Sequence, residues 1–278
     1  MESMRLAMES MSFDGVSLDH GLALVVLAGV LILALTYGLR SIKHGKAQYE
    51  RVEKQGSSSL LSKGVMNMAY WGLEPLGDFC ARWGVSPNRI SYTSLIFGFL
   101  AGFALCFGHF GTAGTLGAVS SLLDSVDGMV ARKLGVSSDA GEVLDASVDR
   151  YVEFFFVAGL VIYYREVLVL MLIALAALLA CFMVSYSTAK AESLQVTPPR
   201  GNMRRTERAL YLTLGAVLAP ISIRYLESPL SVPAGGSVNV GYPMVLSLVM
   251  VAILGNASAL QRLIAIARAL RLREKKIG

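Results

Sequence analysis

Charge, cysteine and histidine are all scarce in this sequence. Asp, Glu, Lys and Arg make up 16% of its 278 residues, whereas 54% are hydrophobic, and a soluble domain is rarely so apolar. The three cysteines and three histidines are scattered, without the spacing of a disulfide framework or a zinc site. We therefore interpret the cysteines as packing residues. Internal repeats and low-complexity segments are absent as well, and the composition points to a chain embedded in a membrane.

Seven apolar stretches approach the length that spans a bilayer. They are Gly21–Leu39, Ser91–Phe110, Gly111–Val130, Val143–Tyr163, Val167–Tyr186, Ala209–Tyr225 and Tyr242–Leu260. Acidic residues precede the first stretch where a signal peptide would be positive, so we interpret it as a retained anchor. The sequence predicts an all-α integral membrane protein, with a six-transmembrane-helix core and an extra N-terminal transmembrane helix.

The distribution of Lys and Arg predicts how these spans are oriented. Only Arg5, Arg165 and Arg224 fall on one side of the predicted membrane, and all other cations fall on the opposite side. By the positive-inside rule, the opposite side is cytoplasmic. We therefore expect a cytoplasmic (inner) membrane protein with its N-terminus outside and its C-terminus inside. The net charge of +5 favours anionic lipid, but cations dispersed among membrane loops do not indicate nucleic-acid binding.

An amphipathic segment, Ser59–Gly84, follows the first span and a polar connection. Apolar residues at near-helical spacing predict a juxtamembrane helix on the inner membrane surface, broken near Pro75. The alternative is a helix packed on the cytoplasmic ends of the spans. Ser86 and Pro87 then predict the start of a membrane helix, with Ser86 as its cap. We divide the chain into an N-terminal anchor and linker, the juxtamembrane helix and the main membrane domain, at residues 1–58, 59–86 and 87–278.

Four aspartates stand out against this apolar background. Asp124 and Asp127 are three residues apart, and Asp145 and Asp149 are four apart, so each pair shares one face of a helix. Acids inside a membrane are costly and usually functional. Two such helices facing each other would gather four carboxylates. That arrangement suits one or two hard divalent cations, which commonly act on phosphate groups.

The residues around the aspartates fit a nucleotide site. Gly128, Ala131 and Gly141 leave space beside the carboxylates, and Arg132 places a permanent cation at the edge of the site. Asp149 could bind a second metal or accept a proton. The structural alternative is that the acids form buried ion pairs with Arg132, Lys133 and Arg150.

The complete pattern is D-x-x-D-G-x-x-A-R, a gap of eight residues, and G-x-x-x-D-x-x-x-D. It resembles the signature of the CDP-alcohol phosphotransferases at every position, and the resemblance covers roughly Pro87 to Leu260. It implies a membrane enzyme, commonly a homodimer, that takes a CDP-linked lipid, usually CDP-diacylglycerol, and an alcohol acceptor and releases CMP.

The resemblance also implies a role for each signature residue. The four aspartates, Asp124, Asp127, Asp145 and Asp149, would hold two Mg²⁺ or Mn²⁺ ions, and Asp149 would act as general base on the acceptor hydroxyl. The nucleotide would be bound by Asp124, Asp127, Gly128, Ala131, Arg132, Gly141 and Asp145.

The segment Ser187–Arg208 concerns the acceptor. Its cations would create a positive pocket beside the metals, suited to an anionic acceptor such as a sugar or polyol phosphate. Ordinary positive-inside topology is the alternative for each cation. The segment is similar to the inositol-phosphate-using branch of the family, which implies Lys190 and Arg208, followed by Arg204 and Arg205, as acceptor contacts. Pro198-Pro199 departs from that branch, so glycerol 3-phosphate and serine stay open as acceptors.

Two other classes compete with this interpretation. A membrane prenyltransferase also uses aspartate-bound Mg²⁺, but it needs two acidic motifs on well-separated helices. A divalent-cation transporter would need polar residues in several further spans, and most spans here are almost purely apolar.

Overall fold

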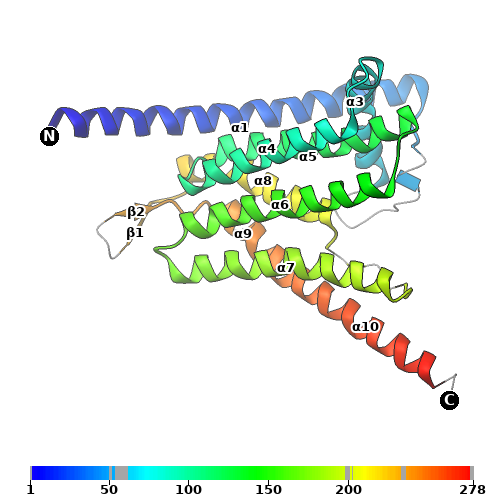
Figure 1. Cartoon of the computed structure of the whole chain (residues 1–278). Coiled ribbons are helices and arrows are strands. Elements are labelled where there is room, and N and C mark those ends of the chain that lie inside the picture. The colour runs from blue at the N-terminus through cyan, green and yellow to red at the C-terminus, as the bar shows by residue number, and fades with distance from the viewer. Residues whose placement is uncertain are drawn as a thin grey trace.

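The structure is a computed structural model that describes residues 2–49, 52–53, 62–197, 201, 203–232 and 236–275, with side chains from residue 18 onward. It is predominantly helical, as predicted (Figure 1). The helices are α1 (Glu2–His44), α3 (Lys63–Arg82), α4 (Pro87–Cys106), α5 (Phe110–Leu134), α6 (Asp139–Tyr163), α7 (Leu168–Ser193), α8 (Arg205–Tyr225), α9 (Tyr242–Met250) and α10 (Asn256–Glu274). A π-helical turn, η1 (Val251–Gly255), joins α9 to α10.

Four of the seven apolar stretches lie within a single helix, and the last lies within the continuous run α9–η1–α10. Ser91–Phe110 extends beyond the end of α4 to the first residue of α5, and Val167–Tyr186 begins one residue before α7. Among the described residues, four helices are long and apolar enough to cross a membrane: Leu18–His44, Pro87–Cys106, Leu168–Ser193 and Tyr242–Glu274. The protein is therefore an all-α, multi-pass membrane protein. Helices α5, α6 and α8 carry the charged residues that lower their hydropathy.

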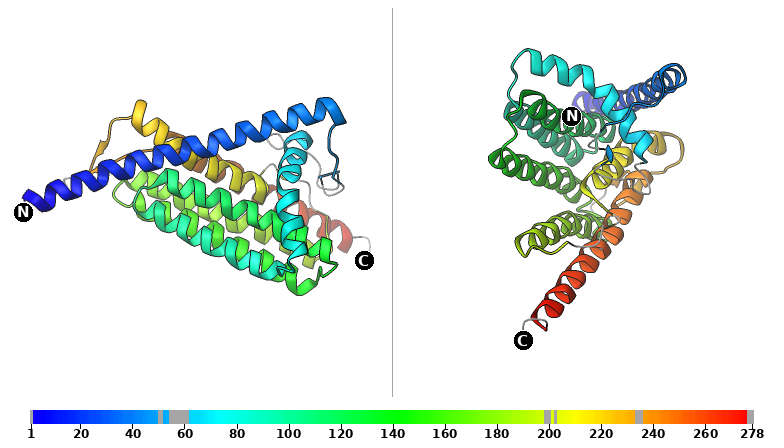
Figure 2. Two further views of the ribbon diagram at one scale, coloured as in Figure 1. Left: turned by 90° about the horizontal axis from the view of Figure 1, so that it is seen from above. Right: turned by 90° about the vertical axis from the view of Figure 1, so that its right-hand side faces the viewer.

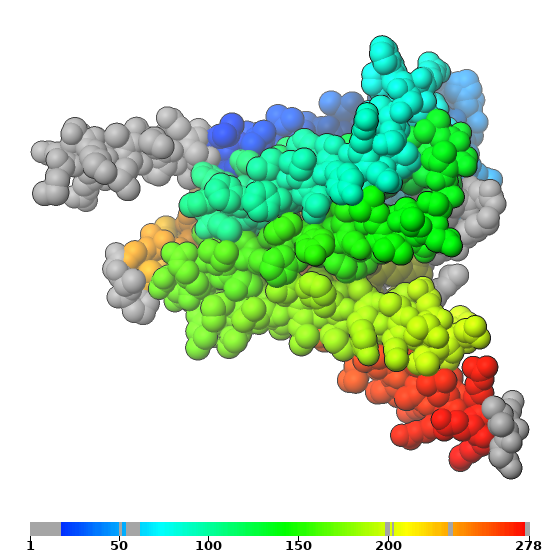
Figure 3. All heavy atoms as spheres, in the orientation of Figure 1, coloured from blue at the N-terminus to red at the C-terminus, as the bar shows by residue number. Residues whose placement is uncertain are grey.

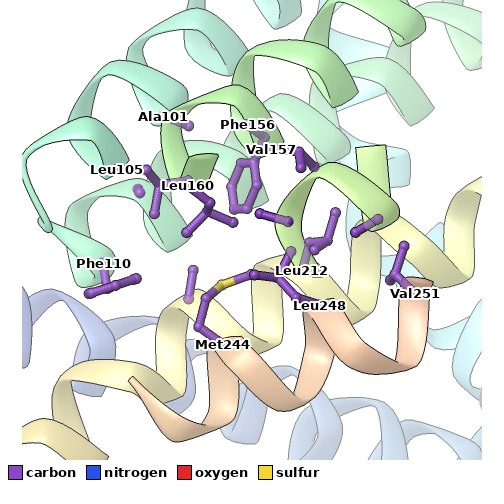
Figure 4. Packing of buried hydrophobic residues seen from close by; sticks show 14 of the residues in the cluster. Ala101, Leu105, Phe110, Phe156, Val157, Leu160, Leu212, Met244, Leu248 and Val251 are labelled. Carbon is purple, nitrogen blue, oxygen red and sulfur yellow. The ribbon is translucent and has the colours of Figure 1, made fainter. Parts of the chain in front are cut away.

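Small residues let the helices of the bundle pack closely. The main core contains many alanines, interleaved with the larger side chains Leu105, Phe110, Phe156, Leu160 and Met244 (Figure 4). Without a strong hydrophobic drive inside a bilayer, helix association depends on such close packing. Helix α4 packs against both α5 and α6 and so fixes how those two helices sit relative to each other.

The extra N-terminal helix is attached to the bundle through a polar contact. Helix α1 runs along α5 and α8 (Figure 2). Its buried Asp19 accepts hydrogen bonds from the backbone N–H and the hydroxyl of Thr112, at 2.9 and 2.7 Å, and lies 3.3 Å from Nδ1 of His109. Because Thr112 lies in the first turn of α5, this carboxylate satisfies a helix N-terminus that would otherwise lack partners.

Helix α3 corrects one expectation. It continues through Pro75 to Arg82, so the predicted break near Pro75 is wrong. Proline removes only one backbone donor, and the helix tolerates that loss. Its N-cap is Ser62, which accepts a hydrogen bond from the backbone N–H of Val65. Residues 59–61 of the predicted helix lie outside the described residues.

Both interpretations of α3 find support in its contacts. The helix lies across the direction of α1 and the bundle helices (Figure 2), and Phe79 and Trp83 are exposed. On its other side, Gly77 faces Met129 of α5, and Asp78 forms an ion pair with Lys133 at the end of α5. Hydrogen bonding from Lys133 lowers the pKa of the Asp78 carboxyl. Helix α3 thus contacts the bundle through some of its residues and exposes apolar side chains through others.

Two connections have defined local structure. Ser86 occupies the N-cap of α4 with Pro87 after it, as predicted, but its hydroxyl makes no capping hydrogen bond. In the connection between α8 and α9, Leu230–Ser231 (β1) pairs antiparallel with Ser237–Val238 (β2). At its base, the Glu227 carboxylate accepts from the backbone N–H groups of Gly241 and Tyr242, both at 2.8 Å. Residues 233–235 lie outside the described part.

Candidate metal and nucleotide site

The two acidic helices are joined by a tight polar connection with a defined cap on each side. Helix α5 ends at Leu134 and is capped by Gly135, whose φ of 66° is accessible to glycine at little cost. Helix α6 begins after Ser138, whose hydroxyl accepts a hydrogen bond from the backbone N–H of Gly141 at 3.2 Å. The connection therefore returns the chain at once and brings the two acidic segments to the same end of the bundle.

Three of the four predicted aspartates converge on one point. Asp124, Asp127 and Asp145 each offer a carboxylate oxygen, and these oxygens lie within 4.8 Å of one another. Asp127 is the buried member, and it accepts a hydrogen bond at 2.5 Å from the hydroxyl of Ser91 on α4. Three carboxylate oxygens from two helices form the donor set that Mg²⁺ or Mn²⁺ prefers. The residues present therefore fit a divalent cation.

Asp149 lies one turn beyond Asp145 and is buried. Its carboxylate forms an ion pair with Arg205, the first residue of α8. The same guanidinium donates a hydrogen bond at 2.6 Å to Asp124 on α5. Arg205 thus links the fourth aspartate to the three that converge.

The structural alternative pairs the aspartates with Arg132, Lys133 and Arg150. Two of these cations pair with other acids instead. Lys133 is paired with Asp78, and Arg150 donates to Glu153 at 2.8 Å. Arg132 is exposed at the end of α5. The acids therefore do not depend on Lys133 or Arg150 for charge balance.

The predicted nucleotide-binding residues border the carboxylates. Gly128 and Ala131 follow Asp127 on the last turns of α5 and are half-buried, and Gly141 lies in the first turn of α6. The nearest atom to a side chain built at Gly141 would be the Ser138 hydroxyl, at 3.3 Å. The surroundings of Gly141 thus leave room for a ligand, and the nucleotide contacts remain predictions.

The four predicted acceptor contacts occupy different environments. Lys190 is exposed at the end of α7, and Arg204 and Arg205 are half-buried at the start of α8. Arg208 is fully buried, and its guanidinium donates two hydrogen bonds to Glu153, at 2.9 and 2.6 Å. A buried arginine needs a paired acid, and this partner directs Arg208 into the bundle. Arg200, which the sequence placed in the same pocket, lies outside the described residues.

Sequence reasoning missed two residues of this region. Glu153 continues the Asp145, Asp149 series at the same four-residue interval, and that interval was the available signal. The sequence places Arg262 of α10 only among the cytoplasmic cations, yet this residue is buried and donates a hydrogen bond to the Thr188 hydroxyl at 2.7 Å. Among the described residues, Nε of Arg262 has no hydrogen-bond partner. Only the fold brings this cation to the end of α7.

The geometry combines a three-acid cation site, a fourth acid one turn away and adjacent arginines. A comparison with known protein families matches residues 84–267 to the CDP-alcohol phosphatidyltransferases. The chain belongs to this family. The match confirms the resemblance recognised in the signature and identifies the protein as a membrane-embedded transferase of phospholipid synthesis. This family assignment rules out the prenyltransferase and transporter alternatives.

Two similar proteins have names that state an activity. The chain is 30% identical to the phosphatidylinositol phosphate synthase of Corynebacterium glutamicum over 186 residues, which cover 64% of this chain and 83% of the relative. It is 29% identical to the archaetidylinositol phosphate synthase of Pyrococcus horikoshii over 161 residues, covering 57% and 84%.

Solved structures support the fold. A crystal structure of Mycobacterium tuberculosis phosphatidylinositol phosphate synthase with CDP-DAG bound aligns with a TM-score of 0.58 at 20% identity, covering 69% of this chain and 92% of that one. A second structure of that enzyme, in complex with manganese and citrate, aligns with a TM-score of 0.59 at the same identity, covering 69% and 87%.

Proposed function

We propose that this protein transfers a phosphatidyl group from a CDP-lipid, CDP-diacylglycerol, to an anionic alcohol such as inositol phosphate and releases CMP. The observation that carries the proposal is the convergence of Asp124, Asp127 and Asp145, with Asp149 and a group of arginines beside them. The relatives named as inositol-phosphate-using synthases support the choice of acceptor.

The metal would be held by Asp124, Asp127 and Asp145, with Asp149 available for a second ion. When bound, Mg²⁺ or Mn²⁺ supplies positive charge that stabilises the phosphoryl oxygens and the leaving CMP. Gly128, Ala131, Arg132 and Gly141 border these acids and would receive the nucleotide. The manganese in a structural relative is consistent with this donor set.

Asp149 would receive the proton of the acceptor hydroxyl. The hydroxyl oxygen forms a bond to the lipid-linked phosphorus, the bond from that phosphorus to CMP breaks, and CMP leaves with the electron pair. A general base must lie within hydrogen-bond reach of the proton it takes, and Asp149 lies one turn beyond Asp145, one of the carboxylates that would hold the metal. The acceptor phosphate would meet the cations at the end of α7 and the start of α8.

The proposed setting follows from the charge distribution along the chain. The acids, the basic residues and the C-terminus would lie on the cytoplasmic side of the inner membrane, with α4 to α10 as the six-span core and α1 as an additional span. The CDP-lipid would then keep its chains in the bilayer while its nucleotide stays in water. We further propose a homodimer, as is common in the family.

The test is CMP release by the purified full-length protein with CDP-diacylglycerol and Mg²⁺ or Mn²⁺. The acceptors are inositol phosphate, free inositol, glycerol 3-phosphate and serine. We expect release with inositol phosphate, dependence on the metal, and little release with free inositol. Release with glycerol 3-phosphate or serine alone would keep the reaction and replace the acceptor. Absence of release with every acceptor would overturn the proposal.

A further inference from the structure

Arg205 has an unusual position for a residue expected to bind substrate. Its guanidinium lies between carboxylates of two different helices, Asp124 of α5 and Asp149 of α6, and it comes from a third helix, α8. The Nη2 group makes both contacts, and on Asp124 the accepting atom is Oδ1. Arg205 therefore supplies a single positive charge to a group of acids that is suited to a divalent cation.

The guanidinium and a divalent cation would compete for these acids. Asp124 belongs to the three-carboxylate group, and an oxygen that accepts a short hydrogen bond from a guanidinium is less available to a metal. Two cations held a few ångströms apart also repel each other, and the repulsion is strong where water is scarce. A metal that takes Asp124 and Asp149 as ligands should therefore weaken the ion pairs that these two acids form with Arg205.

A released Arg205 would remain close to other cations. It follows Arg204 directly, and its own side chain is 31% exposed, so it has room to move. Arg262 of α10 donates a hydrogen bond to Thr188 at the end of α7, and its Nε has no hydrogen-bond partner among the described residues. Arginines gathered in this way repel one another unless an anion lies between them, and the planar guanidinium fork matches a phosphate.

We propose that Arg205 alternates between the metal-binding acids and the anionic acceptor, so that divalent-cation binding and phosphate binding are cooperative. The proposal rests on the proposed function for the identity of the anion. In this arrangement Arg205 is a positioning residue. It balances the charge of the acids before the metal binds, and the metal then makes it available to the phosphate.

A rigid role predicts different behaviour. If Arg205 only fastens α8 to α5 and α6, its replacement should lower thermal stability and leave metal affinity unchanged or weaker. If it acts only through its general positive charge, replacement of the neighbouring Arg204 should raise metal affinity by a similar amount. These two alternatives determine the choice of control variants.

The first experiment measures Mn²⁺ binding to the full-length protein in detergent, by the loss of the free-ion electron paramagnetic resonance signal, without nucleotide or lipid. We expect Arg205→Gln to bind Mn²⁺ about tenfold more tightly than the wild type, because a charge-assisted hydrogen bond no longer has to be broken. Arg204→Gln should change the affinity much less, and Arg205→Lys should lie between the wild type and Arg205→Gln. Unchanged affinity in Arg205→Gln, or an equal effect in Arg204→Gln, would overturn the proposal.

The second experiment measures inositol phosphate binding with and without Mn²⁺ by calorimetry. Linkage requires that the factor by which Mn²⁺ strengthens phosphate binding equals the factor by which phosphate strengthens Mn²⁺ binding. We expect that factor to fall severalfold in Arg205→Gln and to persist in Arg204→Gln. An undiminished factor in Arg205→Gln would contradict the alternation. Inorganic phosphate in place of inositol phosphate tests whether the phosphate alone is sufficient.

The outcome is separable from that of the proposed function. Mn²⁺ binding requires neither CDP-lipid nor turnover, so the predicted change in affinity can be observed even if no acceptor supports CMP release. Conversely, CMP release with inositol phosphate can be found while Arg205→Gln leaves Mn²⁺ binding unchanged. Unchanged Mn²⁺ binding in Arg205→Gln would reject the role assigned to Arg205, whereas absence of CMP release would not.

Discussion

At the scale of single residues, the acids of α6 are separated by their partners. Asp145 belongs to the converging carboxylates, Asp149 pairs with Arg205, and Glu153 pairs with Arg150 and Arg208. The three acids follow one face of a helix at intervals of four residues. This face therefore changes along its length from a cation site to a structural ion-pair network.

Replacement of Asp149 by Asn tests its catalytic assignment. Asparagine keeps the size of the side chain but cannot accept a proton at neutral pH. We expect Asp149→Asn to lower kcat by at least about a hundredfold, in line with the usual contribution of a general base, while CDP-diacylglycerol still binds. Single-turnover CMP release together with a nucleotide-binding assay measures both quantities. Near-normal turnover in this variant would assign the base to another group.

Replacement of Glu153 by Ala tests the buried network. Arg208 is fully buried, and removal of its acid would leave a charge without a partner. We expect a loss of about 3–5 kcal/mol in the free energy of unfolding, seen as a lower thermal unfolding temperature in detergent. Glu153→Gln, which retains hydrogen-bond acceptance, should lose less. Glu166→Ala is the matched control, because its pair with Arg165 is exposed. Equal effects at Glu153 and Glu166 would contradict the importance of the buried pair.

The sequence could predict the acids of this site but not all of its cations. Asp124, Asp127 and Asp145 were identified from spacing because two helical intervals decide which faces carry them. The partner of Arg208 and the position of Arg262 depend instead on how α8 and α10 meet α6 and α7. Helical spacing within one segment contains no information about such contacts between segments.

At the scale of elements, α4 and α6 pack most closely where a glycine of each helix faces the backbone of the other. A side chain built at Gly102 would strike the carbonyl oxygen of Phe155, and one built at Gly159 would strike that of Gly102. Nearby, Gly98 faces Val152, with 2.7 Å between a built Cβ and a methyl group. Helix α4 also carries Ser91, whose hydroxyl donates a hydrogen bond to Asp127 of α5. The close packing of α4 on α6 therefore helps to fix the positions of α5 and α6 relative to each other.

A methyl group at Gly102 should separate these helices. We expect Gly102→Ala to cost about 1–3 kcal/mol in the free energy of unfolding, as overpacking usually does, because the obstructing atom is backbone and cannot rotate away. The thermal unfolding temperature should fall, and Mn²⁺ affinity should weaken with it. Gly38→Ala provides the control, since no atom lies within 4 Å of a side chain built there. A neutral result at Gly102 would show that the two helices can separate without cost.

At the scale of the whole molecule, the helices form a body from which the two ends extend. Figure 3 shows the C-terminal part of α10 projecting beyond the bundle, at the end opposite to the hairpin of β1 and β2. The start of α8 and the end of α10 lie toward this C-terminal end (Figure 1). The hairpin and the start of α5 lie toward the other end.

The proposed orientation in the membrane can be tested with single cysteines. The native residues Cys80, Cys106 and Cys181 are first replaced by Ala, and a cysteine is then placed at Ser237 or at Glu274, both exposed. We expect a membrane-impermeant maleimide to label Ser237→Cys in cells with an intact inner membrane. Glu274→Cys should be labelled only after that membrane is opened. The reverse pattern would invert the topology.

Hydropathy predicted the helical segments of the molecule well, because a backbone in lipid must satisfy its own hydrogen bonds and so becomes helical. It could not show that α3 continues through Pro75, because a single missing donor is tolerated when neighbouring contacts hold the helix. It also could not show how α1 is attached. The bond from Asp19 to Thr112 joins residues 93 positions apart, and no local pattern predicts such a pair.

The π-helical turn Val251–Gly255 has a consequence for the angular phase of the last helix. Such a turn accommodates one residue more than the α-helix around it, so every later side chain is rotated by about 100° from where an unbroken α-helix would point it. Arg262 lies after this turn and faces Thr188. In an unbroken helix the same guanidinium would point about a quarter of a turn away. The number of residues in the final span, rather than their hydropathy, therefore decides whether this cation joins the others.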